Sequence, residues 1–135
     1  KYPNDWGVLD LGGPLMIAPS SDIENVRKMK KDDNFEGGKF LISLLTVYND
    51  VYNHEVVSDE YTKVSKTSIQ IDNKIADRYE SVYLKDTPNG EYVKGDMGIT
   101  VIIPLKSRLL IEYLLADQKY SKIFDQILST FQFTQ

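Results

Sequence analysis

The chain has 135 residues, 27% of them charged, which is typical of one globular domain. Its net charge of -4 and its isoelectric point near 5.0 argue against nucleic-acid binding, because such binding needs a concentrated basic surface. The absence of cysteine excludes disulfides, thiolate metal sites and cysteine nucleophiles, and no apolar run is long enough to span a membrane.

The first half of the chain predicts two or three strands. Residues 6–19 hold two apolar runs separated by Gly12-Gly13, and this pattern predicts a β-hairpin. Residues 20–38 are polar and charged, so we expect a long loop with about one helical turn there. Residues 39–48 are apolar at nearly every position, which predicts a central strand covered on both faces.

The middle of the chain is less regular. Residues 49–64 predict a short helix, whose apolar face would consist of Val51, Tyr52, Val56 and Val57. Residues 65–72 alternate between polar and apolar side chains and predict a strand. A turn at Asn73-Lys74 then leads to a further strand over residues 75–85.

The last part of the chain gives the clearest pattern. Residues 86–96 have loop composition, and residues 98–105 and 108–116 predict two more strands. Asp117 stands where the N-cap of a helix belongs. Apolar side chains then repeat at helical spacing and form a stripe that fits a sheet: Tyr120, Ile123, Phe124, Ile127, Leu128 and Phe131.

Strands joined by hairpins and followed by a helix predict an α+β fold on an antiparallel sheet, with the C-terminal helix packed on that sheet. No internal repeat, low-complexity tract or linker divides the sequence. We therefore expect residues 1–135 to form a single domain.

Several stretches resemble the PsbP-like domain family. "KYPNDWG" is similar to the family's opening strand, and "LMIAPSSD" stands where that strand's hairpin ends. "TSIQIDNKIADRYESVY" resembles the family's central hairpin, and "YSKIFDQILSTFQF" resembles its closing helix. The resemblance covers most of the chain, but its motifs are structural rather than catalytic.

The resemblance implies an α-β-α sandwich, in which helices cover an antiparallel sheet of about six strands. The family includes the thylakoid-lumen PsbP subunit of photosystem II, a Ran-binding nuclear factor and many prokaryotic secreted or lipid-anchored proteins of unknown role, most of them non-enzymatic. The sequence opens at Lys1 with a strand-like segment directly after it. We therefore expect an extracytoplasmic location and a preceding N-terminal signal or anchor that these residues do not include.

A search for chemistry finds one histidine. His54 lies in "YNHEVVSDEY", and with Glu55, Asp59 and Glu60 it gives a candidate site for a divalent metal such as zinc or manganese. The plainer interpretation is a solvated loop whose histidine is incidental. No other cofactor motif is found, and no base lies near a nucleophile in the sequence, so we expect no enzymatic activity.

The chain contains nine tyrosines, many of them in its middle. Strands accept tyrosine well, so half-buried sheet positions are the plainer interpretation. The functional interpretation is a partner-binding surface, because tyrosine gives much contact area at a low cost in conformational entropy. Tyr79, Tyr83 and Tyr92, together with the loop at 86–96, are the best candidates for it.

The leading hypothesis is a non-catalytic, extracytoplasmic PsbP-like domain that binds a protein partner or a membrane-associated complex. The main alternative is a carrier of a small ligand or divalent metal, held in a pocket between sheet and helix. A hydrolase is the weakest alternative.

Overall fold

The computed structural model describes residues 4–10, 15–29, 44–51, 53, 55–106, 108–115 and 121–133. Within these ranges the chain forms seven strands and two helices. Their bounds, in chain order, are β1 (Trp6–Asp10), β2 (Leu15–Pro19), α1 (Ser20–Met29), β3 (Leu44–Asn49), β4 (Thr62–Ile71), β5 (Lys74–Tyr83), β6 (Met97–Ile103), β7 (Leu109–Leu115) and α2 (Ser121–Ser129).

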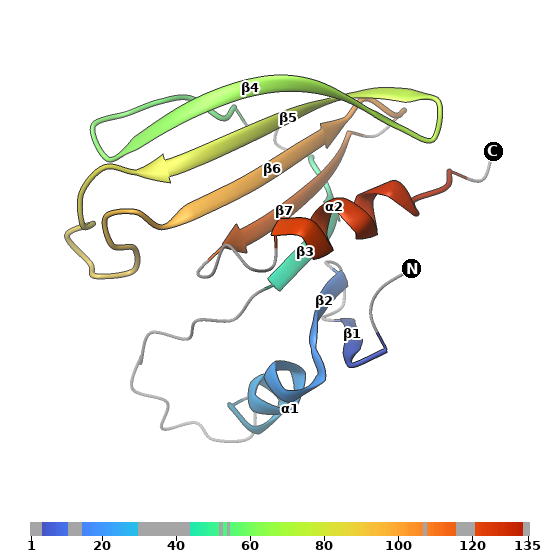
Figure 1. Ribbon diagram of the computed structural model, residues 1–135, viewed down its shortest axis with the longest axis horizontal. Helices are drawn as coiled ribbons and strands as arrows, with labels where there is room; N and C mark the ends of the chain where they lie inside the picture. Colours follow the sequence, from blue (N-terminus) through green and yellow to red (C-terminus); the bar gives the residue numbers. More distant parts are fainter. Residues whose placement is uncertain are drawn as a thin grey trace.

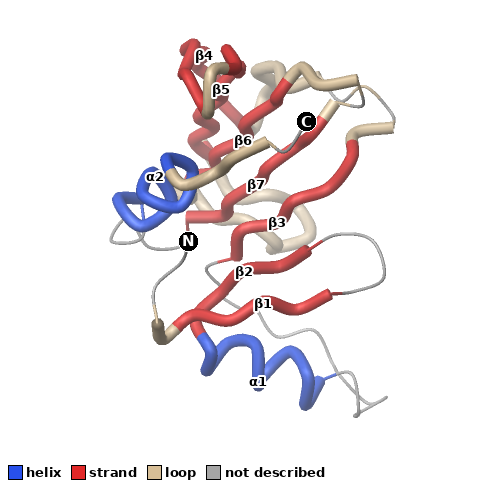
Figure 2. Tube along the Cα trace, turned by 90° about the vertical axis from the view of Figure 1, so that its right-hand side faces the viewer, coloured by secondary structure: helices blue, strands red, loops and turns tan. Residues whose placement is uncertain are grey.

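All seven strands belong to one antiparallel sheet, in the order β1-β2-β3-β7-β6-β5-β4 (Figures 1 and 2). Strands β4 to β7 follow one another in sequence and in space. The pairing of β3 with β7 joins this meander to the N-terminal strands. The pairing of Trp6 with Pro19 confirms the predicted first hairpin, whose turn at Gly12-Gly13 lies outside the described residues.

The expected α-β-α sandwich of about six strands is wrong. The described residues are mostly β, and the two helices among them have only 10 and 9 residues. The physical reason lies in the strand pattern. On the face away from α2, β4 and β5 carry polar side chains such as Lys66, Ser68 and Asp77, so these two strands offer no apolar stripe to hold a helix on that side.

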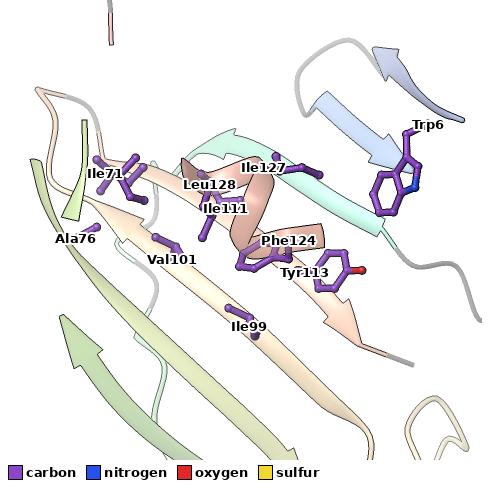
Figure 3. Packing of buried hydrophobic residues seen from close by; sticks show 11 residues of the cluster. Trp6, Ile71, Ala76, Ile99, Val101, Ile111, Tyr113, Phe124, Ile127 and Leu128 are labelled. Atoms are coloured by element: carbon purple, nitrogen blue, oxygen red, sulfur yellow. The ribbon is translucent and has the colours of Figure 1, made fainter. Parts of the chain in front are cut away.

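The other face of the sheet carries the core. Val101, Ile111 and Tyr113 lie on this face of β6 and β7, fully or almost fully buried. Helix α2 packs over them with Phe124, whose ring lies 4.9 Å from that of Tyr113 (Figure 3). Ile127, Leu128 and Trp6 belong to the same cluster. The described part of the C-terminal apolar stripe is therefore core, as its spacing predicted, although Phe131 follows the end of α2. Tyr120 and the N-cap proposed at Asp117 lie outside the described residues.

Helix α1 replaces part of a predicted loop, since residues 20–29 form almost three turns rather than one. A methyl group added at Gly7 would lie 2.9 Å from Cδ1 of Ile23. Because Gly7 and Trp6 point to opposite faces, α1 packs on the face away from α2, against β1 and β2.

The short helix predicted within residues 49–64 is not found in the described residues of that segment. Val51 and Val57 are 73% and 66% exposed, so they do not form a buried helical face. Asn53 has a φ of 51°, which interrupts a right-handed helix. The chain instead forms a loop that enters β4 at Thr62.

The turn between β4 and β5 lies one residue earlier than predicted. Asp72 and Asn73 have φ angles of 41° and 58°, and Ile71 pairs with Lys74. Two central residues with positive φ are the mark of a type I′ hairpin, in which Asp and Asn are tolerated in place of glycine. Neither described helix is long and apolar enough to cross a membrane.

Candidate functional site

The sheet face opposite α2 carries a hollow of about 750 Å³ over β4 to β7. We call this surface the tyrosine face, because Tyr79 and Tyr83 of β5 point from it. Two loops form the walls of the hollow, one before β4 and one between β5 and β6. The lining residues are Glu55, Val56, Val57, Asp59, Tyr61, Thr62, Val64, Ser81, Tyr83, Thr87, Pro88, Asn89, Glu91, Tyr92, Thr100 and Glu112.

The hollow exists because its floor is made of small side chains. Ser81 of β5 lies opposite Gly98 of β6, and Thr100 is the next β6 residue on the same face. Tyr83 stands beside Ser81 on β5, and Glu112 of β7 lies opposite Thr100. Large side chains around short ones leave a depression over the middle of the sheet.

The loop between β5 and β6 forms one wall and is held by many hydrogen bonds. The N–H of Tyr83 donates to the carbonyl of Asp96 (2.9 Å), and the N–H of Gly95 donates to the carbonyl of Tyr83 (2.8 Å). At the tip, the N–H of Tyr92 donates to Oγ1 of Thr87 (3.0 Å). These bonds fold the Tyr92 ring back onto Tyr83, with centroids 4.4 Å apart and planes within 9°.

The loop before β4 forms the other wall. Oδ1 of Asp59 accepts hydrogen bonds from the N–H groups of Tyr61 and Thr62, both at 2.7 Å, and from the Thr62 hydroxyl at 2.9 Å. These bonds lower the pKa of Asp59, so its carboxylate stays ionised. Nζ of Lys85 lies 4.4 Å from the Tyr61 ring centroid and 3.0 Å from Oε2 of Glu60.

The hollow is an acidic environment. Four of the described residues that line it carry carboxylates, at positions 55, 59, 91 and 112. None of the described lining residues is Lys or Arg. Burial, followed by the neighbouring Tyr92 and Glu91, raises the pKa of Tyr83 to about 12. Burial and then Glu91 and Glu112 raise the pKa of Tyr92. The Tyr48 hydroxyl hydrogen-bonds to Glu112. Burial, and after it the charge of Glu112, raises the pKa of Tyr48 as well.

These raised tyrosine pKa values predict a loss of stability in alkali. The unfolded chain releases a tyrosine proton near its ordinary pKa of about 10, whereas folded Tyr83 keeps it until about pH 12. Between these values the unfolded state binds fewer protons than the folded state, so the free energy of unfolding falls as pH rises. Urea denaturation at several pH values from 8 to 12, about one unit apart, measures this slope.

Tyr83→Phe provides the control for this experiment, because it keeps the stacked ring and removes the titrating hydroxyl. We expect its stability to fall less steeply over that pH window, with the remaining slope due to Tyr92 and Tyr48. An identical slope in the variant would contradict the assignment of a raised pKa to Tyr83.

The structure brings together two of the three predicted partner-binding tyrosines. Tyr83 and Tyr92 stack in the hollow. Tyr79 lies on the same face of β5 but does not line the hollow, and Nζ of Lys66 from β4 lies 5.7 Å from its ring centroid. Whether any of the three meets a partner stays a prediction.

The predicted metal set is divided between different roles. Asp59 caps the start of β4, Glu60 pairs with Lys85, and Glu55 lines the rim of the hollow. In the described part of the chain, no three acidic or histidine side chains converge on a point where they could hold an ion. His54 lies outside the described residues, so the metal site stays a prediction.

A second, smaller hollow of about 450 Å³ lies between α2 and β4, on the core side of the sheet. Arg78 and Asp125 are the charged groups among its described lining residues, and the Arg78 guanidinium lies 3.3 Å from Oε2 of Glu80. This is the place that the sequence-based alternative, a pocket between sheet and helix, would use. It lacks the aromatic side chains that the larger hollow has.

Sequence reasoning missed most of the larger hollow. Thr100, Ser81 and Glu112 come from three consecutive strands, but the sequence does not fix the pairing register that places them side by side. Glu112 carried the only signal, since it is a charged residue at the centre of an apolar strand.

Comparison with known protein families, with curated proteins and with solved structures found no match to this chain.

Proposed function

We propose that this chain is a non-catalytic binding module and that the hollow on its tyrosine face receives a protein partner. The stacked pair of Tyr83 and Tyr92 beside a floor of small side chains is the observation that carries the proposal. Tyrosine is enriched at the centres of protein interfaces, because one ring gives a large contact area and can also hydrogen-bond. An extracytoplasmic location is part of the proposal and rests on the sequence resemblance alone.

The walls of the hollow support a protein as the occupant. Val57 lines one wall of the hollow, and Val93 belongs to the loop that forms the other wall; they are 66% and 36% exposed. Aliphatic side chains around an aromatic centre are the arrangement by which interfaces exclude water from their central contacts. The hydrogen bonds that hold the loop at 86–96 also fix Tyr92 before binding, which reduces the entropy cost of association.

The absence of cysteine and the presence of a single histidine in the sequence favour binding over catalysis, because nucleophilic catalysis needs an activated nucleophile and a base. The small-ligand alternative is less favoured by position. Ligand pockets are usually enclosed and mostly apolar, whereas this hollow lies on the sheet surface and includes four carboxylates.

Site-specific photocrosslinking in the source cells tests the proposal. A photoreactive phenylalanine analogue placed at Ser81, on the floor of the hollow, is expected to give one major protein adduct, identified by mass spectrometry of its peptides. The comparison position is Asp125, an exposed residue of α2 that lines the smaller hollow, so it also reports on the alternative site. A second Tyr92→Ala substitution in the Ser81 protein should remove the adduct, because it removes half of the ring stack.

The pattern of adducts decides the outcome. An adduct from Ser81 that depends on Tyr92 and is missing from Asp125 supports docking on the tyrosine face. Three results would each overturn the proposal: the same adducts from both positions, an adduct from Asp125 alone, or no adduct from either position.

A further inference from the structure

We propose that the group received by the hollow is the guanidinium of an arginine on the partner protein. This inference rests on the proposed function and adds the chemistry of the partner to it. It follows from the kind and the position of the groups that line the hollow, taken together with a cation that the chain already binds at the rim.

Charge complementarity comes first. Glu112 lies on the floor, Asp59 and Glu55 lie in the wall before β4, and Glu91 lies in the wall after β5. An entering cation would therefore face carboxylates on three sides, while none of the described lining residues is a lysine or arginine that could neutralise them. Tyrosine rings add to this attraction, because the face of an aromatic ring is negative.

The rim gives an intramolecular example of the same chemistry. The ammonium of Lys85 lies 4.4 Å from the Tyr61 ring centroid and 3.0 Å from Oε2 of Glu60. A tyrosine ring and one carboxylate are therefore enough to hold a cation at the edge of the hollow. The hollow offers two further rings, those of Tyr83 and Tyr92, and the carboxylate of Glu112, all of them partly buried, while the other three carboxylates lie exposed in its walls.

The shape of the lining favours arginine over lysine. Tyr83 and Tyr92 lie in nearly parallel planes, and a planar guanidinium can stack against an aromatic face as a compact ammonium cannot. Guanidinium also presents five N–H donors in a fork, so it can bond to carboxylates on different sides of the hollow together. A protein is the expected source, because exposed Val57 and Val93 extend the surface beyond the reach of one side chain.

Nuclear magnetic resonance titration with defined peptides tests the inference. The probe is a short glycine peptide, blocked at both ends, with one central arginine, and its twin carries the neutral isostere citrulline. We expect the arginine peptide to shift the backbone amides of Ser81, Thr100 and Glu91, and the citrulline twin to leave them unchanged. A lysine peptide should bind more weakly, and added salt should weaken the binding of both cations.

Two charge-neutralising variants make the test specific. Glu112→Gln should weaken binding of the arginine peptide about tenfold, because it removes a charge-assisted bond on the floor. Glu24→Gln removes the same charge from an exposed site on α1 and should leave binding unchanged. Circular dichroism checks that both variants are folded.

Any one of four results would overturn the arginine assignment. These are binding of the citrulline or lysine peptide as tight as that of the arginine peptide, no binding of the arginine peptide, unchanged binding of it by the Glu112→Gln protein, and amide shifts centred on α2. Failure of this inference is distinguishable from failure of the proposed function. If a Tyr92-dependent adduct forms at Ser81 while the arginine peptide does not bind, the hollow receives a protein by another chemistry. If neither result is obtained, both proposals fail.

Discussion

Replacing Phe124 with alanine is expected to lower the free energy of unfolding by about 3–5 kcal/mol. The Phe124 side chain is 0% exposed and stacks on Tyr113 at the centre of the core. The substitution removes the apolar contact and leaves a cavity beneath α2 that a sheet on one side and a helix on the other can only partly close. For a domain of ordinary stability, about 5–15 kcal/mol, this loss is a large fraction of the total free energy of unfolding.

Urea denaturation followed by circular dichroism measures this loss. Lys122→Ala, an exposed substitution on the same helix, is the matched control and should change stability by no more than about 0.5 kcal/mol. The stability of Phe124→Leu should lie between those of Phe124→Ala and Lys122→Ala, because leucine keeps part of the buried volume. A Phe124→Ala protein with the stability of the Lys122→Ala control would show that the stripe on α2 is not core.

The second large effect is expected at the ends of β3 and β7. Oδ2 of Asp50 lies 3.3 Å from the Arg108 guanidinium, and the Asp50 side chain is completely buried. Arg108→Leu should therefore lower the free energy of unfolding by about 3–5 kcal/mol, because it leaves a buried carboxylate without its cation. The backbone bond from the N–H of Asp50 to the carbonyl of Arg108 (2.7 Å) is retained in this variant.

A double variant tests this explanation. Asp50→Asn combined with Arg108→Leu removes the buried charge as well, and we expect it to regain most of the stability lost by Arg108→Leu alone. Arg108 also donates to Oδ1 of exposed Asn53 (3.1 Å), so Asn53→Gly serves as a control that loses only this bond. Glycine fits the positive φ of Asn53, so Asn53→Gly should change the free energy of unfolding by no more than about 1 kcal/mol. A double variant less stable than Arg108→Leu would show that burial of the charge is not the main cost.

Periodicity predicted those elements whose two sides face different environments. The nine-residue helix that includes Phe124 is amphipathic, and the strands that include Val101 and Ile111 alternate or are apolar throughout. In these segments the local pattern agrees with the tertiary contacts, so the sequence was sufficient to predict the type of element and its buried side. Helix α1 was missed because its few apolar residues, among them Ile23, bury a narrow strip against β1 and β2.

The arrangement of layers was predicted wrongly, because it was taken from a family resemblance rather than from the strands. The polar positions of β4 and β5, such as Ser68 and Asp77, already argued against a helix over these two strands on the tyrosine face. The hollow could not be derived for another reason. Its floor depends on the pairing register of β5, β6 and β7, which sets Ser81 opposite Gly98 and Thr100 opposite Glu112, and the alternation of side chains alone does not fix that register.

The order of the strands in the sheet has a consequence for how the chain folds. Strands β4 to β7 are joined to their neighbours in sequence, so their pairing requires only short loops to close. The pairing of Leu44 with Leu114 instead closes a long loop, and such contacts of high sequence separation form slowly. We expect the β4–β7 meander to form first and the N-terminal strands to join it later. The floor of the hollow would then take shape early in folding, before the sheet is complete.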